Sequence, residues 1–135
     1  MASLEDVRLI PRVRLADARG WLLKVIEGSE EGLPTRTGEV YVTLAHPGQV
    51  RGGHYHLEAA EWFTVIKGEA DIRLTVPGGG ETRALRLSAE QPATLFVPPG
   101  IAHAFRNASE TEEMLLLAYA SVAYDPGDTV PYTLE

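Results

Sequence analysis

The chain has 135 residues, which is the size of one domain rather than two. Hydrophobic residues make up 44% and charged residues 23%, a globular composition that excludes an intrinsically disordered chain. The net charge of −7 argues against sequence-independent binding to nucleic acid or anionic membranes, and the absence of cysteine excludes a disulfide scaffold and a thiolate metal site.

Neither a signal peptide nor a membrane span is expected. The first ten residues, MASLEDVRLI, lack a basic start and an apolar stretch. The longest apolar run, Met114 to Ala120, is far shorter than the ~20 residues that span a bilayer. We therefore expect a cytoplasmic protein.

The predicted elements are short strands separated by turns. Strands are expected within residues 5–27, ahead of a polar loop at residues 28–38 that we expect to be exposed. Residues 40–44 and 63–66 are predicted strands because β-branched and aromatic side chains dominate them. Turn residues recur at Asp17–Gly20, Pro47–Gly48, Lys67–Gly68, Pro77–Gly80, Pro98–Gly100 and Asp125–Gly127.

The second half of the chain continues this pattern. Residues 72–76 and 85–87 alternate apolar and polar side chains around a glycine-rich turn, which predicts an antiparallel hairpin. The run Met114–Tyr119 is ambiguous, since Leu and Met favour helices, but it follows a series of strands and is predicted to be one. About ten short antiparallel strands predict an all-β sandwich or barrel. The last ten residues are expected to lie over this barrel or over a partner.

Three of the four histidines and one glutamate form a pattern with metal-ligand character. His54 and His56 are two residues apart in a predicted strand, so both imidazoles point to one face. Glu61 opens the next predicted strand, and His103 follows a Pro-Pro-Gly turn into another. Three neutral imidazoles and one carboxylate suit a divalent metal, although a bare His-x-His pair is more often two unrelated polar side chains.

The spacing of these residues resembles that of the cupin family. The first cupin motif is matched by Gly48, His54, His56, Glu61 and Gly68. The core of the second is matched by Pro98–Gly100, His103 and Asn107. The resemblance implies a single-domain, jelly-roll-like β-barrel over residues 1–135, with its core at about residues 38–120 and a C-terminal tail at residues 121–135.

The resemblance also implies a metal site. A divalent zinc, iron, manganese or nickel ion would be held by His54, His56, Glu61 and His103, and no organic cofactor is expected. Some cupins instead keep these side chains as a metal-free acid/base cluster. The two uses compete, because a metal-bound His54 cannot also be a free base, and the sequence leaves both open.

Flanking segments resemble those of cupins that act on nucleotide-linked 4-keto sugars. They are Asp17–Leu22, the strand around Tyr41, Arg51–His56 and Tyr124–Asp128. Similar series occur in dTDP-4-dehydrorhamnose 3,5-epimerases, in keto-hexose 3,4-ketoisomerases, and in the C-terminal cupin domain of capsular polysaccharide biosynthesis enzymes.

Three departures discriminate among these relatives. The 3,5-epimerases carry lysine in place of Glu61, glutamine in place of His56, and a late supporting aspartate where this chain has Val122. A ketoisomerase or a metal-bearing epimerase therefore fits better. The resemblance implies an enzyme that isomerises or epimerises a nucleotide-linked 4-keto-6-deoxy sugar in surface polysaccharide or deoxysugar biosynthesis.

Such a reaction needs a base beside the ketone and an acid to return the proton. His54 or His56 suits the base, because histidine titrates near neutral pH. Tyr41 is a candidate acid, although a tyrosine in a barrel more often packs in the core.

Two arginines are candidates for binding the diphosphate of the substrate. Arg51 precedes the His-x-His pair and Arg106 follows His103, and a guanidinium pairs well with phosphate oxygens. By strict alternation Arg51 faces away from His54, so its role depends on a bulge at Gly52–Gly53.

Two other functions fit the same residues. One is a metal-dependent cupin oxygenase of a small molecule, which ferrous iron and substrate-dependent oxygen uptake would favour. The other is a non-catalytic carbohydrate- or metabolite-binding cupin, which ligand binding without turnover would favour. In each case the expected partners are a small molecule and a second copy in a homodimer, with no nucleic acid and no membrane.

Overall fold

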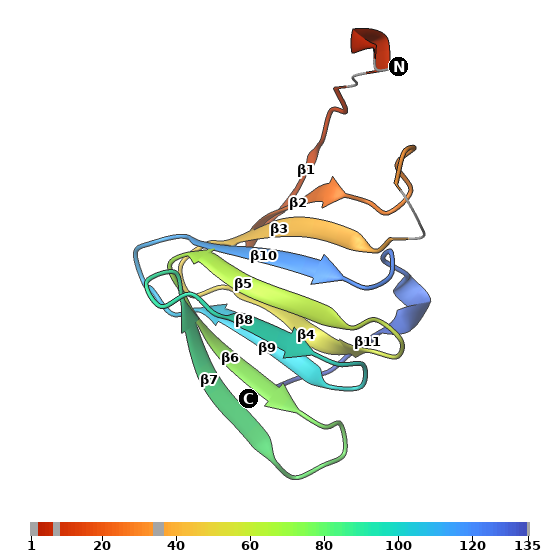
Figure 1. Cartoon of the computed structure of the whole chain (residues 1–135). Coiled ribbons are helices and arrows are strands. Elements are labelled where there is room, and N and C mark those ends of the chain that lie inside the picture. The colour runs from red at the N-terminus through yellow and green to blue at the C-terminus, as the bar shows by residue number, and fades with distance from the viewer. Residues whose placement is uncertain (1–2, 7–8, 34–36, 135) are drawn as a thin grey trace.

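The computed structural model describes residues 3–6, 9–33 and 37–134, and nearly all of its elements are strands (Figure 1). No helix in these ranges is long and apolar enough to cross a membrane. In chain order the elements are η1 (Leu4–Asp6), β1 (Arg14–Asp17), β2 (Gly20–Ile26), β3 (Glu39–Ala45), β4 (Val50–His56), β5 (Glu61–Lys67), β6 (Glu69–Thr75), β7 (Thr82–Ser88), β8 (Thr94–Val97), β9 (Ala102–Asn107), β10 (Met114–Ala120), η2 (Pro126–Asp128) and β11 (Thr129–Pro131), where η denotes a 3-10 turn.

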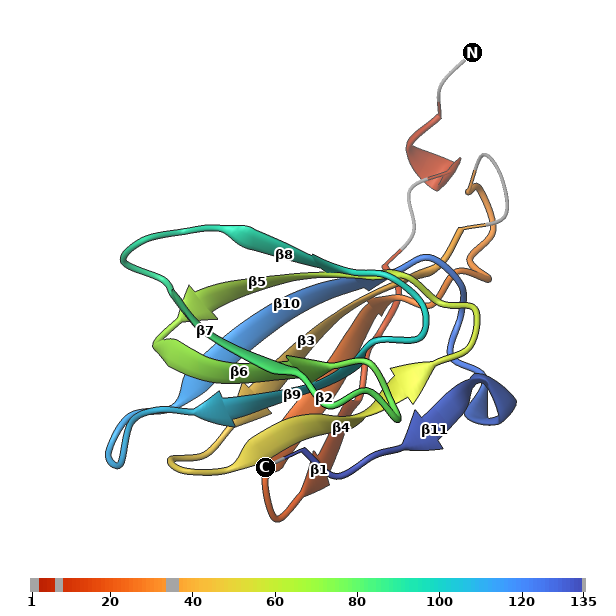
Figure 2. The ribbon, with the colours of Figure 1, turned by 90° about the horizontal axis from the view of Figure 1, so that it is seen from below.

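Two antiparallel sheets stack face to face and enclose the core (Figure 2). The six-stranded sheet has the order β1-β2-β3-β10-β5-β8, and the five-stranded sheet has the order β11-β4-β9-β6-β7. Inward-facing apolar side chains of both sheets pack together, among them Ala45, Phe63, Val65, Ile72, Phe105, Met114 and Leu116. The all-β prediction is confirmed, with eleven described strands where about ten were expected.

The predicted hairpin and the ambiguous strand of the second half of the chain are also confirmed. The predicted hairpin is β6 paired with β7, with Ile72 opposite Leu85. Met114–Ala120 is β10, which lies between β3 and β5 in the six-stranded sheet. Pairing on both edges outweighs the helical preference of its Leu and Met residues, because strand propensity depends strongly on tertiary context.

The N-terminal strands begin later than predicted. Leu4–Asp6 form a 3-10 turn, and β1 starts only at Arg14. Leu9 and Val13, which precede it, are 96% and 75% exposed. The segment projects away from the sheets (Figure 1), so the expectation of strands from residue 5 is wrong in its N-terminal bound.

The C-terminal residues lie on the barrel, as expected. Strand β11 pairs with β4, with Thr129 opposite His56 and Pro131 opposite His54. On its other edge β4 pairs with β9, where the register shifts between Gly52 and His54. The predicted bulge is therefore present.

Candidate functional site

The four predicted ligand residues converge from both sheets. His54 and His56 lie on β4 and His103 on β9, whereas Glu61 is the first residue of β5 in the opposite sheet. One ligand atom from each residue lies within 4.8 Å of the others. Zinc ligands, at about 2.1 Å from the ion, lie about 3 to 4 Å apart, so this spacing is close to that of a metal site.

One carboxylate oxygen lies at the centre of this His/Glu cluster without a hydrogen-bond partner. Glu61 Oε1 is 2.7 Å from His56 Nε2 and 3.4 Å from His103 Nε2, but neither contact has hydrogen-bond geometry. His103 Nδ1 is 3.0 Å from the carbonyl of Ile101. A carbonyl only accepts, so Nδ1 carries the proton and a neutral His103 turns the lone pair of Nε2 toward the carboxylate. Converging lone pairs are what a divalent cation satisfies, and these residues fit one.

Tyr41 is bonded to the other oxygen of the same carboxylate. Its hydroxyl donates to Glu61 Oε2 at 2.7 Å. Burial and the adjacent charge of Glu61 hold the pKa of Tyr41 well above its usual value of 10, so the phenol keeps its proton at neutral pH. Burial raises the pKa of Glu61, whereas the hydrogen bond from Tyr41 lowers it.

His54 is neutral at physiological pH. Burial, with His103 and His56 nearby, lowers the pKa of His54 to about 4. A neutral imidazole has a free lone pair, which serves equally for binding a metal or for accepting a proton.

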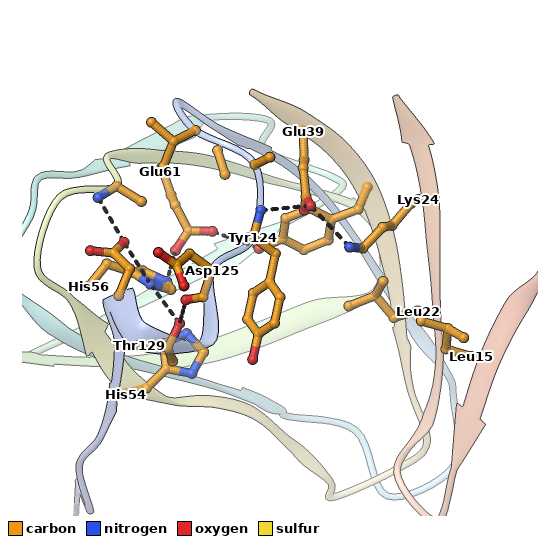
Figure 3. Close-up of a pocket in the computed structure, with 16 residues that line it drawn as sticks. Leu15, Leu22, Lys24, Glu39, His54, His56, Glu61, Tyr124, Asp125 and Thr129 are labelled. Atoms are coloured by element: carbon orange, nitrogen blue, oxygen red, sulfur yellow. Dashed lines mark hydrogen bonds and ion pairs between the residues drawn. The ribbon is translucent and has the colours of Figure 1, made fainter. Parts of the chain in front are cut away.

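Two adjoining cavities open beside the cluster. One, of about 340 Å³, is lined by His54, His56 and Glu61 and on its far side by Lys24 and Glu39 (Figure 3). The second, of about 320 Å³, is lined by His54 and His103. Five residues line both cavities, namely Leu22, Tyr41, His54, Tyr124 and Thr129. His54 and Tyr41 therefore face the space in which a bound molecule would extend from one cavity into the other.

The second cavity contains two arginines. Arg51 is buried beside Gly52 and His54, because the bulge turns it to the inner face of β4. Arg19, from the β1–β2 turn, lines the same cavity. Asp17 accepts hydrogen bonds from Arg19 at 2.7 Å and from Arg51 at 3.5 Å.

Arg106 does not reach the site. It is exposed on β9, three residues after the inward-facing His103, so the pleat turns it to the opposite face. The prediction that Arg106 binds substrate therefore conflicts with its placement, and Arg19 is the second arginine of the cavity instead.

Sequence reasoning missed several lining residues. Lys24 and Glu39 pair at 3.0 Å, and Glu39 also accepts from the amide of Tyr124 at 2.8 Å. Thr129 Oγ1 lies 3.2 Å from His56 Nδ1, and the carboxylate of Asp128 lies 3.8 Å from the same nitrogen. The signal for Asp128 was the segment Tyr124–Asp128, which resembles that of sugar-nucleotide cupins, whereas no sequence signal indicated Thr129.

A family model described as the Polysaccharide biosynthesis C-terminal domain matches residues 15–132. The chain belongs to this family. The match to the Polysaccharide biosynthesis C-terminal domain runs through β11, so it includes the tail residues that line the first cavity.

Two curated relatives cover most of the chain. The spore coat polysaccharide biosynthesis protein SpsL of Bacillus subtilis is 23% identical over 91% of this chain and 83% of its own length. A dTDP-4-dehydrorhamnose 3,5-epimerase of Sinorhizobium fredii is 28% identical over 98% of this chain and 69% of its own length.

Two solved structures share the fold. The capsular polysaccharide assembling protein CapF of Staphylococcus aureus aligns with a TM-score of 0.81 and 24% identity over 93% of this chain, which spans 34% of the CapF chain. The sugar 3,4-ketoisomerase QdtA of Thermoanaerobacterium thermosaccharolyticum, in complex with TDP, aligns with a TM-score of 0.60 and 25% identity over 95% of this chain and 89% of QdtA. The predicted resemblance to sugar-nucleotide cupins is confirmed by these proteins.

Proposed function

We propose that the protein isomerises or epimerises a nucleotide-linked 4-keto-6-deoxy sugar in surface polysaccharide or deoxysugar biosynthesis. The observation that carries this proposal is a neutral His54 at the junction of two cavities, beside the His/Glu cluster in one direction and two arginines in the other. The relatives named as a dTDP-4-dehydrorhamnose 3,5-epimerase and as a sugar 3,4-ketoisomerase support chemistry of this kind for this chain.

The reaction begins with removal of a proton next to the ketone. His54 has the lone pair to accept it and lies on the wall of both cavities. Tyr41, which keeps its own proton and faces the same space, is the candidate acid for the enolate or for the neighbouring carbon. The sugar would then lie between His54 and Tyr41.

The diphosphate would lie in the second cavity. Arg51 and Arg19 both line it, in a chain whose net charge is otherwise −7. A guanidinium fork binds two phosphate oxygens at once, so Arg51 and Arg19 would offset part of the charge of a diphosphate, in exchange for their contacts with Asp17.

A divalent metal would be held by His56, Glu61 and His103, with His54 as a possible fourth ligand. When bound, it supplies electrostatic stabilisation for the oxygen of an enolate. We propose zinc, iron, manganese or nickel, and no organic cofactor. Metal content of His54→Asn, measured by plasma mass spectrometry, separates the two roles of His54: metal retained with activity lost identifies a base, and metal lost identifies a ligand.

The proposal is tested by proton exchange. Purified protein is incubated in deuterated water with dTDP-4-keto-6-deoxyglucose, and NMR follows the protons next to the ketone. Exchange or isomerisation that is lost in His54→Asn is expected. Binding of the sugar nucleotide without exchange would indicate a binding protein, and oxygen uptake with ferrous iron would indicate an oxygenase; either result would overturn the proposal.

We further propose that the protein is a homodimer, joined through the outer face of the six-stranded sheet. Trp62 packs there at tilted angles against Phe96 and Tyr119, with ring centroids 4.9 and 5.6 Å apart, and Ile66 of the same strand as Trp62 is nearly half exposed. Six strands spaced about 4.8 Å apart present roughly 500 Å² per copy, so two copies would bury about 1,000 Å². The N-terminal segment exposes apolar side chains such as Leu9 and Val13. In a dimer, this segment of each copy could pack on the outer face of the partner's six-stranded sheet.

A further inference from the structure

The segment that follows β10 binds the loop between His56 and Glu61. Four consecutive backbone amides of that loop, residues 57–60, donate hydrogen bonds to it. Leu57 donates to the carbonyl of Asp128 at 3.0 Å, Glu58 to Asp128 Oδ1 at 2.6 Å, Ala59 to Asp128 Oδ2 at 3.1 Å, and Ala60 to Ser121 Oγ at 2.9 Å. Three of the four bonds therefore end on one residue.

Asp128 is built into this position. It is 7% exposed, and both of its carboxylate oxygens accept from the loop. It ends the 3-10 turn η2, whose start is capped by Asp125, since the side chain of Asp125 accepts from the amide of Gly127 at 2.9 Å. The next residue, Thr129, brings its hydroxyl to 3.2 Å from His56 Nδ1.

The loop matters because it sets a short distance between two side chains of different sheets. His56 ends β4 and Glu61 begins β5, so only residues 57–60 connect them. Their side chains approach to 2.7 Å. The loop residues belong to no strand, and the conformation that permits this approach is held by the bonds to Asp128 and Ser121.

We propose that Asp128 is a positioning residue that fixes the spacing of His56 and Glu61 and thereby sets the affinity of the His/Glu cluster for a divalent metal. The inference rests on the metal site of the proposed function. Partners that orient metal ligands without touching the ion commonly change affinity by about 10- to 100-fold when they are replaced. Asp128 acts on the loop that connects two ligand residues, so an effect in that range is expected.

The test compares Asp128→Asn with Asp125→Asn. An asparagine at 128 keeps one acceptor oxygen but turns an NH2 group toward a loop amide, so one bond is replaced by two opposed donors. Asp125→Asn makes the same change of charge and size three residues away, at a side chain that caps η2 and is not bonded to the loop by any described contact. Zinc dissociation constants are measured by competition with a chromophoric chelator, at a temperature where circular dichroism shows all variants folded.

The expected result is a zinc dissociation constant about 10- to 100-fold higher in Asp128→Asn and within about 3-fold of wild type in Asp125→Asn. An unchanged constant in Asp128→Asn, or an equal loss in both variants, would overturn the inference while leaving the metal site intact. Wild-type protein with no measurable zinc affinity would contradict the metal site itself. The positioning role would then be decided by native-state hydrogen exchange, which must accelerate at residues 57–60 in Asp128→Asn alone.

Discussion

Tyr41 connects strand β3 to the His/Glu cluster through a single hydrogen bond to Glu61. Removing the hydroxyl in Tyr41→Phe leaves a buried carboxylate oxygen without its donor, which costs about 1–3 kcal/mol. We expect the free energy of unfolding of chelator-treated protein, measured in urea, to fall by that amount. If Tyr41 also supplies the proton, turnover should fall about 100-fold or more with KM little changed.

The matched control is Tyr119→Phe, on the outer face of β10 beside Trp62. It loses the same atom from a side chain that lies away from the cluster, so stability and turnover should change little. Equal effects in the two variants would mean that the hydrogen bond to Glu61 contributes to neither stability nor turnover.

The lowered pKa of His54 makes the stability of the protein depend on pH. The pKa is about 4 in the folded protein and 6.5 in an unfolded chain, so between these values the unfolded state binds more protons. The free energy of unfolding of metal-free protein should therefore fall as pH is lowered from about 6.5 to about 4, and it should be insensitive to His54 above about pH 7. Urea midpoints at half-unit pH steps measure this, and His54→Asn should flatten the slope in that window. A wild-type midpoint that stays constant from pH 6.5 to 5 would contradict the lowered pKa.

At the scale of elements, the bulge in β4 decides which residues enter the site. Gly52 and Gly53 both have positive φ, of 85° and 81°, so alanine is strained at either position. A Cβ at Gly52 would lie 2.9 Å from the carbonyl oxygen of His103, whereas at Gly53 the nearest atom is 3.8 Å away. The two glycines thus form a natural pair of test and control.

We predict that Gly52→Ala loses more stability than Gly53→Ala, by roughly 1 kcal/mol or more, because only the first pushes β4 away from β9. Arg51 should move with it, so affinity for TDP should fall more in Gly52→Ala. Urea unfolding and isothermal titration calorimetry measure the two effects. Equal losses in both variants would show that backbone strain alone, rather than contact with β9, decides the outcome.

The strands and the bulge show what could be predicted from the sequence. Residue parity placed His54 and His56 on one face, and the adjacent glycines indicated how Arg51 could join them. The same parity would have excluded Arg106, since it is three residues from His103. Arg106 was predicted because it lies close to His103 in the sequence and because a guanidinium pairs well with phosphate, and neither reason takes the face of the strand into account.

Other parts of the site depend on contacts that no local pattern encodes. Asp128 and Thr129 reach His56 because β11 pairs with β4, across a sequence separation of more than 70 residues. Lys24 faces the cavity because β2 pairs with β3 and places it opposite Tyr41. Alternation gives the face of a strand but not its neighbour in the sheet, so these residues could be recognised only in the folded chain.

At the scale of the whole molecule, the uncovered outer face of the six-stranded sheet predicts the response to a charge placed there. If the proposed dimer forms, Trp62→Glu or Phe96→Glu should convert it to a monomer, because a carboxylate buried in an apolar interface is costly. Size-exclusion chromatography with light scattering gives the mass directly.

Val76→Glu is the control, since Val76 is 57% exposed but follows β6 in the other sheet. It should leave the mass unchanged. A wild-type protein that is a monomer at micromolar concentration would contradict the proposed dimer, and the two face variants should then differ from it only in solubility.

The cluster and the acceptors that hold its loop lie in different parts of the chain. When the ribosome has translated residue 120, the nascent chain already contains Tyr41, Arg51, all four residues of the His/Glu cluster and ten of the eleven described strands. The loop between His56 and Glu61 still lacks every acceptor that holds its amides, because Ser121 and Asp128 are not yet made. A chain truncated after residue 120 would therefore keep every residue of the cluster and lose the contacts that hold the loop between two of its members.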